Sequence, residues 1–95
     1  MSFRDSYLRG LRARLERWSI EIDELERRAG RLAGSAQLRA EERLADLRRQ
    51  RVALRQLAAR MAEARVEQLD DLKHRCERSA RALAEALERA RIETI

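Results

Sequence analysis

The stretch LRGLRARLERWSIEIDELERRAGRL, residues 8–32, carries the clearest structural signal in this chain of 95 residues. Its apolar residues recur in steps that alternate between three and four. This spacing places them along one stripe of an α-helix and is the pattern of a coiled-coil seam. We therefore predict a helix over about residues 3–32, packed against a partner along this stripe. The seam positions are Leu8, Leu11, Leu15, Trp18, Ile22, Leu25, Ala29 and Leu32.

Polar residues and glycines mark the ends of this predicted helix. Ser2 followed by Asp5 forms a capping pattern, because the serine hydroxyl can accept a hydrogen bond from a free backbone amide. Gly34 suits the left-handed conformation that often ends a helix, and Ser35 suits the N-cap of a following helix. We expect a turn at about residues 33–35, with an antiparallel helical hairpin around it.

The second predicted helix runs over about residues 36–92, because no glycine or proline follows Ser35. At 1.5 Å per residue it would reach roughly 85 Å, against roughly 42 Å for the first helix. The first helix can therefore cover only half of the second. The apolar stripe beyond residue 68 is left without cover and calls for a partner. Its positions are Leu69, Leu72, Cys76, Ala80, Leu83 and Leu87.

Two all-α architectures would cover this stripe within a single domain, residues 1–95. In the first, the long helix continues and two hairpins dimerise into a four-helix bundle, with the stripe as the dimer interface. In the second, a break near Gln68 to Asp71 folds the last third back into a three-helix bundle, and Asp70 caps the new helix. The stretch around the possible break contains no Gly, Pro, Ser or Asn. Its composition favours continuity, and therefore the dimer.

The composition points to a soluble helical protein that attracts acidic partners. Charged residues make up 41% of the chain, the net charge is +5, and Lys73 is the single lysine, so arginine carries the basic excess. One cysteine excludes an internal disulfide and fits a reducing compartment. The sequence contains neither the apolar core of a signal peptide nor an apolar run long enough to span a membrane. We expect a cytoplasmic protein.

The hairpin geometry predicts where the arginines gather. Folding the chain about residue 34 brings residue i opposite residue 69 − i. The acidic residues of 21–26 then face Arg43, Arg48 and Arg49, which balances the charge near the turn. The open end is strongly positive and forms a candidate anion-binding cluster, to be neutralised by a partner's carboxylates or by phosphate. This cluster comprises Arg9, Arg12, Arg14, Arg17, Arg51, Arg55 and Arg60.

No residue pattern predicts catalysis, a cofactor or a metal. His74 and Cys76 are two residues apart on a helix, so they point in nearly opposite directions and cannot share an ion within one chain. Cys76 continues the apolar stripe and is interpreted as a small core residue. Trp18 lies on the seam and is predicted to be a core anchor, close to Arg51 or Leu54, with an arginine stacked on its ring.

Residues 1–30 resemble the start of small bacterial coiled-coil proteins of a stress-response family. The shared pattern is M-S-x-R-D-x-Y, then spaced leucines, then W-x-x-E-I-D-x-L-E-x-x-A. The later segments ADLRRQRVALRQL and LDDLK are also similar, although Leu69 stands where the family usually has a tryptophan. The resemblance implies a stress-linked coiled-coil role and brings no catalytic residue. The matching residues are Ser2, Arg4, Asp5, Tyr7, Trp18, Glu21, Ile22, Asp23, Leu25, Glu26 and Ala29.

Two functional hypotheses follow from the sequence. The first is a non-enzymatic interaction protein that self-associates and presents arginine-rich faces to an acidic partner protein. The second is a polyanion binder that uses the arginine cluster to hold a nucleic acid or an anionic lipid surface. The first is favoured, because the sequence has no helix-turn-helix spacing, no zinc pattern and no aromatic platform for bases.

Overall fold

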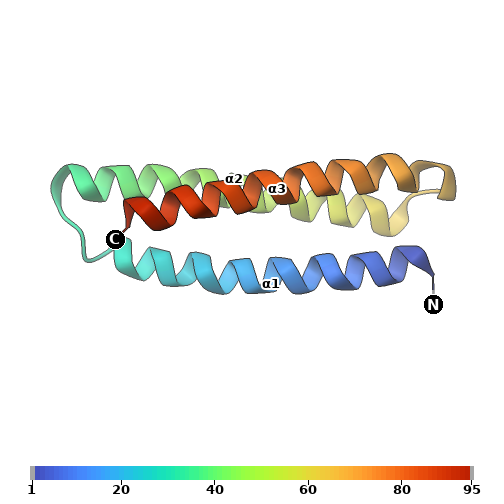
Figure 1. Ribbon diagram of the computed structural model, residues 1–95, viewed down its shortest axis with the longest axis horizontal. Helices are drawn as coiled ribbons and strands as arrows, with labels where there is room; N and C mark the ends of the chain where they lie inside the picture. The colour runs from blue at the N-terminus through green and yellow to red at the C-terminus, as the bar shows by residue number, and fades with distance from the viewer. Residues whose placement is uncertain (1, 95) are drawn as a thin grey trace.

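The computed structural model describes residues 2–94, which form three long helices and contain no strand (Figure 1). The helices are α1 (Phe3–Ala29), α2 (Gly34–Glu63) and α3 (Leu69–Glu93), with a short 3-10 helix η1 (Val66–Gln68) between the last two. α1 and α3 run in the same direction and α2 runs in the opposite direction, in a rod of about 50 × 19 × 16 Å. The all-α prediction is confirmed.

The helix α1 begins and packs as its sequence predicts. The Asp5 backbone N–H donates to Ser2 Oγ at 3.1 Å, so Ser2 is the N-cap. The helix ends at Ala29, about one turn before the predicted end, and the Gly30 N–H donates to the Glu26 carbonyl at 3.1 Å. The seam residues Leu8, Leu11, Leu15, Ile22, Leu25 and Ala29 are buried, whereas Trp18 and Leu32 are only partly buried.

The connection between α1 and α2 lies earlier than predicted. Gly34 has a φ of +62°, which confirms the left-handed conformation, but it is the first residue of α2 rather than the end of α1. Ala33 occupies the N-cap position without a side-chain hydrogen bond, so the prediction that Ser35 caps this helix was wrong. Figure 1 shows the first turns of α2 extending past the end of α1.

The prediction of one continuous second helix over residues 36–92 was wrong. α2 ends at Glu63, and Ala64 and Arg65 have extended backbones with ψ values of 154° and 155°. The chain then turns through η1 and begins α3 at Leu69. The break therefore lies slightly before the alternative site at Gln68 to Asp71. Asp70 and Asp71 occupy the first turn of α3, whose N-cap position is held by Gln68.

Long-range hydrogen bonds explain a break that contains no glycine or proline. The guanidinium of Arg4, at the start of α1, donates to the carbonyls of Ala62, at 3.4 Å, and of Ala64. These carbonyls belong to the groups that the end of a helix leaves without partners. The Arg65 N–H donates to Gln68 Oε1 at 3.2 Å, and the Gln68 N–H donates to the Arg65 carbonyl at 2.9 Å. The turn is thus stabilised both from a distant helix and by hydrogen bonds of its own.

Burial of the α3 stripe is the reason that the break forms. Fully burying a large aliphatic side chain stabilises by about 1.5–3 kcal/mol, whereas each hydrogen bond lost at the break costs about 1 kcal/mol. α3 makes its most extensive contacts with α2. Five of the six candidate dimer-interface positions are therefore buried inside the chain, and Leu69 is partly buried. The buried five are Leu72, Cys76, Ala80, Leu83 and Leu87.

This burial removes the reason for which the sequence favoured a dimer. The dimer model rested on an apolar stripe left bare by α1, and α1 and α2 of the same chain cover the stripe. The described part of α3 therefore has no bare apolar stripe left for a second hairpin to cover.

Substitution of Leu83 tests the burial of the apolar stripe of α3. Leu83 has no exposed surface, so Leu83→Glu places an unpaired carboxylate in the core and should lower the free energy of unfolding by about 3–5 kcal/mol. The neighbouring Ala84 is exposed, and Ala84→Glu should change the free energy of unfolding by less than about 0.5 kcal/mol. Urea unfolding followed by circular dichroism measures both. Equal stability of the two variants would contradict the packing of α3.

Candidate functional site

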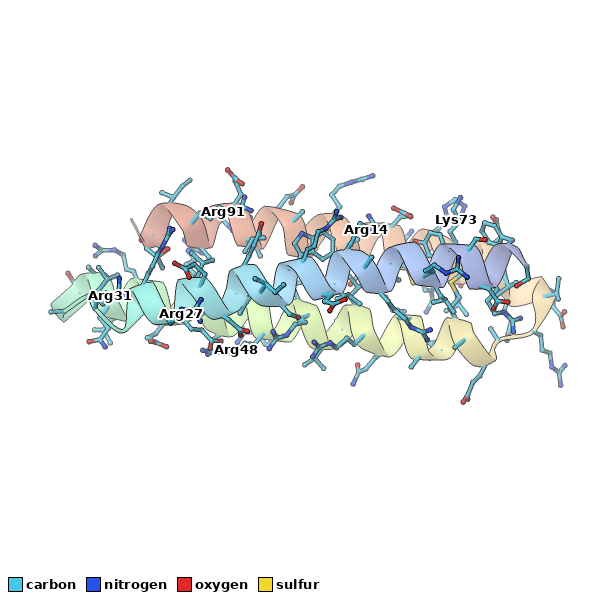
Figure 2. The ribbon with its side chains drawn as sticks, turned by 90° about the horizontal axis from the view of Figure 1, so that it is seen from below. Arg14, Arg27, Arg31, Arg48, Lys73 and Arg91 are labelled. Carbon is cyan, nitrogen blue, oxygen red and sulfur yellow. The ribbon has the colours of Figure 1, made fainter. Side chains whose placement is uncertain are left out.

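The residues that flank the seam of α1 connect it to both neighbouring helices. Tyr7, Arg14 and Glu21 follow one another at seven-residue intervals and all reach α3. The Tyr7 hydroxyl donates to Glu77 Oε1 at 2.6 Å, and Arg14 Nη2 lies 3.9 Å from the same oxygen. The Glu21 carboxylate accepts from Arg91 at 2.7 Å. Figure 2 shows Arg14 and Arg91 on the side that α1 shares with α3.

The opposite flank of α1 faces α2. Here Glu26 accepts from Arg48 at 3.1 Å, and Ser19 Oγ accepts from Arg55 at 3.2 Å. Ser19 and Glu26 are seven residues apart on α1. Arg12 lies seven residues before Ser19, but it has no carboxylate opposite it on α2. Figure 2 places Arg48 on the side that α1 shares with α2.

These contacts correct the predicted register of the hairpin. The paired residue numbers, 26 with 48 and 19 with 55, each sum to 74 rather than to 69. The shift arises because the first turns of α2 extend past the end of α1. Of the three arginines predicted to face the acidic residues of α1, Arg48 alone pairs with one, while Arg49 pairs with Asp46 on its own helix at 3.6 Å.

The predicted cluster of seven arginines does not form one surface. Arg14 is directed to α3 by Glu77, and Arg60 borders a groove on the side where α2 meets the start of α3. Arg12 and Arg55 do come together, in a groove between α1 and α2 that Leu15, Ala58 and Ala59 also line. Glu16 lines the same groove, and Asp5 lies with Arg9 and Arg12 in the next one along α1.

Two residues, Arg51 and Trp18, differ from their predicted environments. Arg51 lies on the seam of α2 between Leu47 and Leu54; it is partly buried, and its Nε has no hydrogen-bond partner among the described residues. Its aliphatic stem therefore covers apolar surface. Trp18 packs at the margin of the core, and the arginine over its ring, at 5.7 Å, is Arg14 rather than Arg51. Trp18 is thus a peripheral contact and not a fully buried anchor.

The outward side of α2 carries the most distinctive surface. Between Asp46 and Glu63 the sequence contains no acidic residue. Two shallow, mainly apolar grooves follow one another there, the first lined by Val52, Ala53 and Gln56 and the second by Ala53, Gln56 and Ala59. Arginines border them at both ends. We call this surface the α2 outer face and define it by Arg48, Arg49, Val52, Ala53, Gln56, Ala59 and Arg60.

The remaining candidates for chemistry are separated by the fold. Cys76 is buried in the core, and burial raises the pKa of its thiol. His74 lies outside on the same helix, 3.6 Å from Asp70. Within residues 2–94 no group of three or more His, Cys, Asp or Glu side chains is arranged to hold a metal ion. Of the helices in this range, none has the length and apolar character required to cross a membrane.

Arg4 and Tyr7 are the two structurally important residues that periodicity alone did not identify. Arg4 forms the contacts that close the α2–α3 connection, and Tyr7 joins α1 to Glu77. The heptad position of Tyr7, next to the seam residue Leu8, could have indicated an interhelical contact. Nothing local to Arg4 predicts its partners, which are 58 and 60 residues away.

Comparison of the chain with protein-family models, with curated proteins and with solved structures gives no match. The evidence for a function therefore comes from the fold and its surfaces.

Ionisation of Tyr7 gives a spectroscopic test of the α1–α3 contact. Burial raises the pKa of Tyr7 well above its ordinary value of 10.0, and the hydrogen bond and the charge of Glu77 raise it further. The stabilisation is complete below about pH 10 and is lost at higher pH, because the unfolded chain gives up the tyrosine proton first. Tyrosinate absorbance reports Tyr7 alone, since the chain has one tyrosine. We expect the absorbance to rise only together with loss of helicity.

The variant Glu77→Gln is the control for this titration. It removes the carboxylate charge while it keeps an oxygen acceptor, so the pKa of Tyr7 should move back toward its ordinary value. A wild-type protein that is half ionised at about pH 10, the ordinary tyrosine value, with unchanged circular dichroism would show that the Tyr7–Glu77 contact does not form.

Proposed function

We propose that this protein is a non-enzymatic interaction protein whose α2 outer face binds an acidic helix of a partner protein. The observation that carries the proposal is the combination on one helix of exposed small apolar side chains with bordering arginines. The sequence resemblance of residues 1–30 supports a stress-related role for the interaction, in a bacterial cytoplasm.

The shape of the α2 outer face suits a helix. Ala53, Gln56 and Ala59 have small or flexible side chains at helical spacing, so a second helix can approach closely along the shallow grooves. Val52 is 49% exposed and provides an apolar contact near the centre. A partner helix would place apolar residues in these grooves at intervals of three and four, as in other helix-in-groove complexes.

The charge of this face determines the kind of helix that it would bind. Arg60 forms no ion pair with any described residue, and Arg49 forms only an exposed pair with Asp46, of the kind that contributes less than about 1 kcal/mol. Glutamates near both ends of the contact on a partner helix could therefore bind arginines that are largely free to accept new partners. Such pairs increase the rate of encounter and select against basic partners.

The second candidate function is binding of a polyanion, a nucleic acid or an anionic lipid surface, through the groove shared by Arg12 and Arg55. These arginines come from two helices and have no carboxylate ion-pair partner among the described residues. Glu16 and Asp5 lie along the same grooves, however, and would repel phosphate. The protein-partner hypothesis is favoured for that reason.

A binding assay with matched charge variants tests the proposed function. The probe is a fluorescent helical peptide of alanine and leucine with a row of glutamates on each edge of its apolar stripe. The double variant Arg49→Glu/Arg60→Glu should weaken its binding at least about tenfold, because two favourable contacts become repulsive. Arg78→Glu/Arg81→Glu, on the exposed side of α3, makes the same change in net charge and should leave the binding within about twofold.

A labelled DNA duplex in the same assay separates the two candidate functions. A polyanion site that neutralises about three phosphates would show a log–log salt slope of about −3 and would be weakened by Arg12→Glu. Tight duplex binding with that slope, together with equal effects of both double variants on the peptide, would contradict the proposal.

A further inference from the structure

The connection between α2 and α3 has a backbone that its local sequence does not favour. Ala64 (φ −73°, ψ 154°) and Arg65 (φ −71°, ψ 155°) are extended, although alanine and arginine are among the strongest helix formers. The segment has no glycine or proline, and Val66 is 77% exposed, so the connection buries little of its own. A straight helix through residues 63–69 satisfies the local preferences better than the turn does.

One interaction from outside the segment opposes this straightening. The Arg4 guanidinium donates to the carbonyls of Ala62 and Ala64, and both acceptors are available to it only while α2 ends at this point. In a continuous helix the same carbonyls would accept from backbone amides four residues later. Arg4 therefore stabilises the turn and not the straight form.

We propose that residues 64–68 form a hinge through which two copies of this chain exchange α3, and that Arg4 favours the closed monomer over the exchanged dimer. In the exchanged form α2 and α3 join into one helix of about 60 residues, roughly 90 Å long. Each α3 then packs against α1 and α2 of the partner copy.

The free-energy balance of this exchange depends on few interactions. The burial of Leu72, Cys76 and Leu83, and the hydrogen bond from Tyr7 to Glu77, are the same whether α3 packs in its own chain or in the partner. Exchange of identical elements is for this reason a low-cost route to dimers. The two forms differ in three respects. The exchanged form has additional helical hydrogen bonds at its two hinges, it lacks both the Arg4 hydrogen bonds and the Arg65–Gln68 turn bonds there, and its formation costs the entropy of association.

This inference is independent of the proposed function, because the α2 outer face is exposed in both forms. The exchanged dimer shares its continuous helix with the dimer expected from the sequence, and differs from it in its cause, because there a bare stripe forces association. Here the closed monomer is complete, and the dimer is a second arrangement of the same packing whose population rises with protein concentration.

Two substitutions shift the balance in opposite directions. Arg4→Ala removes the hydrogen bonds that favour the turn. The two hydrogen bonds of one Arg4, of which the bond to Ala62 is long at 3.4 Å, together contribute roughly tenfold in an equilibrium constant, so with two hinges per dimer the association constant should rise about a hundredfold. Arg65→Pro fits the observed backbone of Arg65 and of the residue before it, and its ring excludes a helix through the hinge. It loses only the exposed bond from the Arg65 N–H to Gln68.

The experiment refolds each variant from denaturant at low and at high protein concentration and measures mass by light scattering. Wild type should form a fraction of dimer only at high concentration, and Arg4→Ala should form it at about a hundredfold lower concentration. Arg65→Pro and the double variant Arg4→Ala/Arg65→Pro should stay monomeric. Arg9→Ala, an exposed arginine of the same helix, is the matched control and should behave as wild type.

An intrachain distance identifies the dimer as the exchanged form. Spin labels at positions 49 and 85, in a Cys76→Ala background and diluted with unlabelled chain, report one chain at a time. The two sites lie on neighbouring antiparallel helices in the closed form, but are about 36 residues or about 54 Å apart along a straight helix. Dimers should give the long distance and monomers a short one.

Three results would each overturn the proposal. The first is a dimer that persists in Arg65→Pro, and the second is a dimer that gives only the short distance. The third is that wild type and folded Arg4→Ala both remain monomeric at all concentrations. If Arg4→Ala does not fold, the comparison of wild type with Arg65→Pro at high concentration decides the matter alone.

Discussion

The reversal of the chain between Ala64 and Gln68 is the constraint on which the rest of this structure depends. It returns α3 to α1 and α2, and so buries an apolar stripe that would otherwise lie bare along half of a long helix. The local backbone propensity opposes the turn, because its two extended residues are helix formers. The burial of α3 provides the driving force, and Arg4 satisfies the carbonyls that the end of α2 leaves free. Tertiary interactions thus override local propensity at this point, as they commonly do.

α1 contacts both other helices through one heptad pattern. Its seam residues enter the core, and the positions on either side of the seam reach different neighbours: Tyr7 and Glu21 reach α3, and Ser19 and Glu26 reach α2. These polar contacts fix the register of the bundle, which the apolar seam alone would leave free to slide by a turn. They also use arginines that the sequence would assign to a common cluster, and leave the α2 outer face as the surface with the clearest potential for recognition.

The periodicity of the sequence predicted the features that depend on a single helix. The seam of α1, the cap at Ser2, the left-handed Gly34 and the apolar stripe of α3 all follow from the spacing and type of nearby residues. The break at residue 64 could not be predicted in this way, because the side chain that stabilises it lies about 60 residues away. The predicted arginine cluster does not form one surface, for a related reason. Its assembly required the register of α1 against α2, which the overhang of α2 changes, and the position of α3, which brings Glu77 to Arg14 and the start of α3 to Arg60.

Small-angle X-ray scattering on a dilute solution, with the mass measured by light scattering on the same sample, tests the central claim most directly. The compact three-helix bundle predicts the mass of one chain, a maximum dimension close to the 50 Å length of the rod, and a radius of gyration close to 15.3 Å before the hydration layer is added. A hairpin with a continuous second helix would instead give a maximum dimension of at least about 85 Å. That value, in a sample at monomer mass or at twice that mass in dilute solution, would contradict the return of α3 onto its own chain.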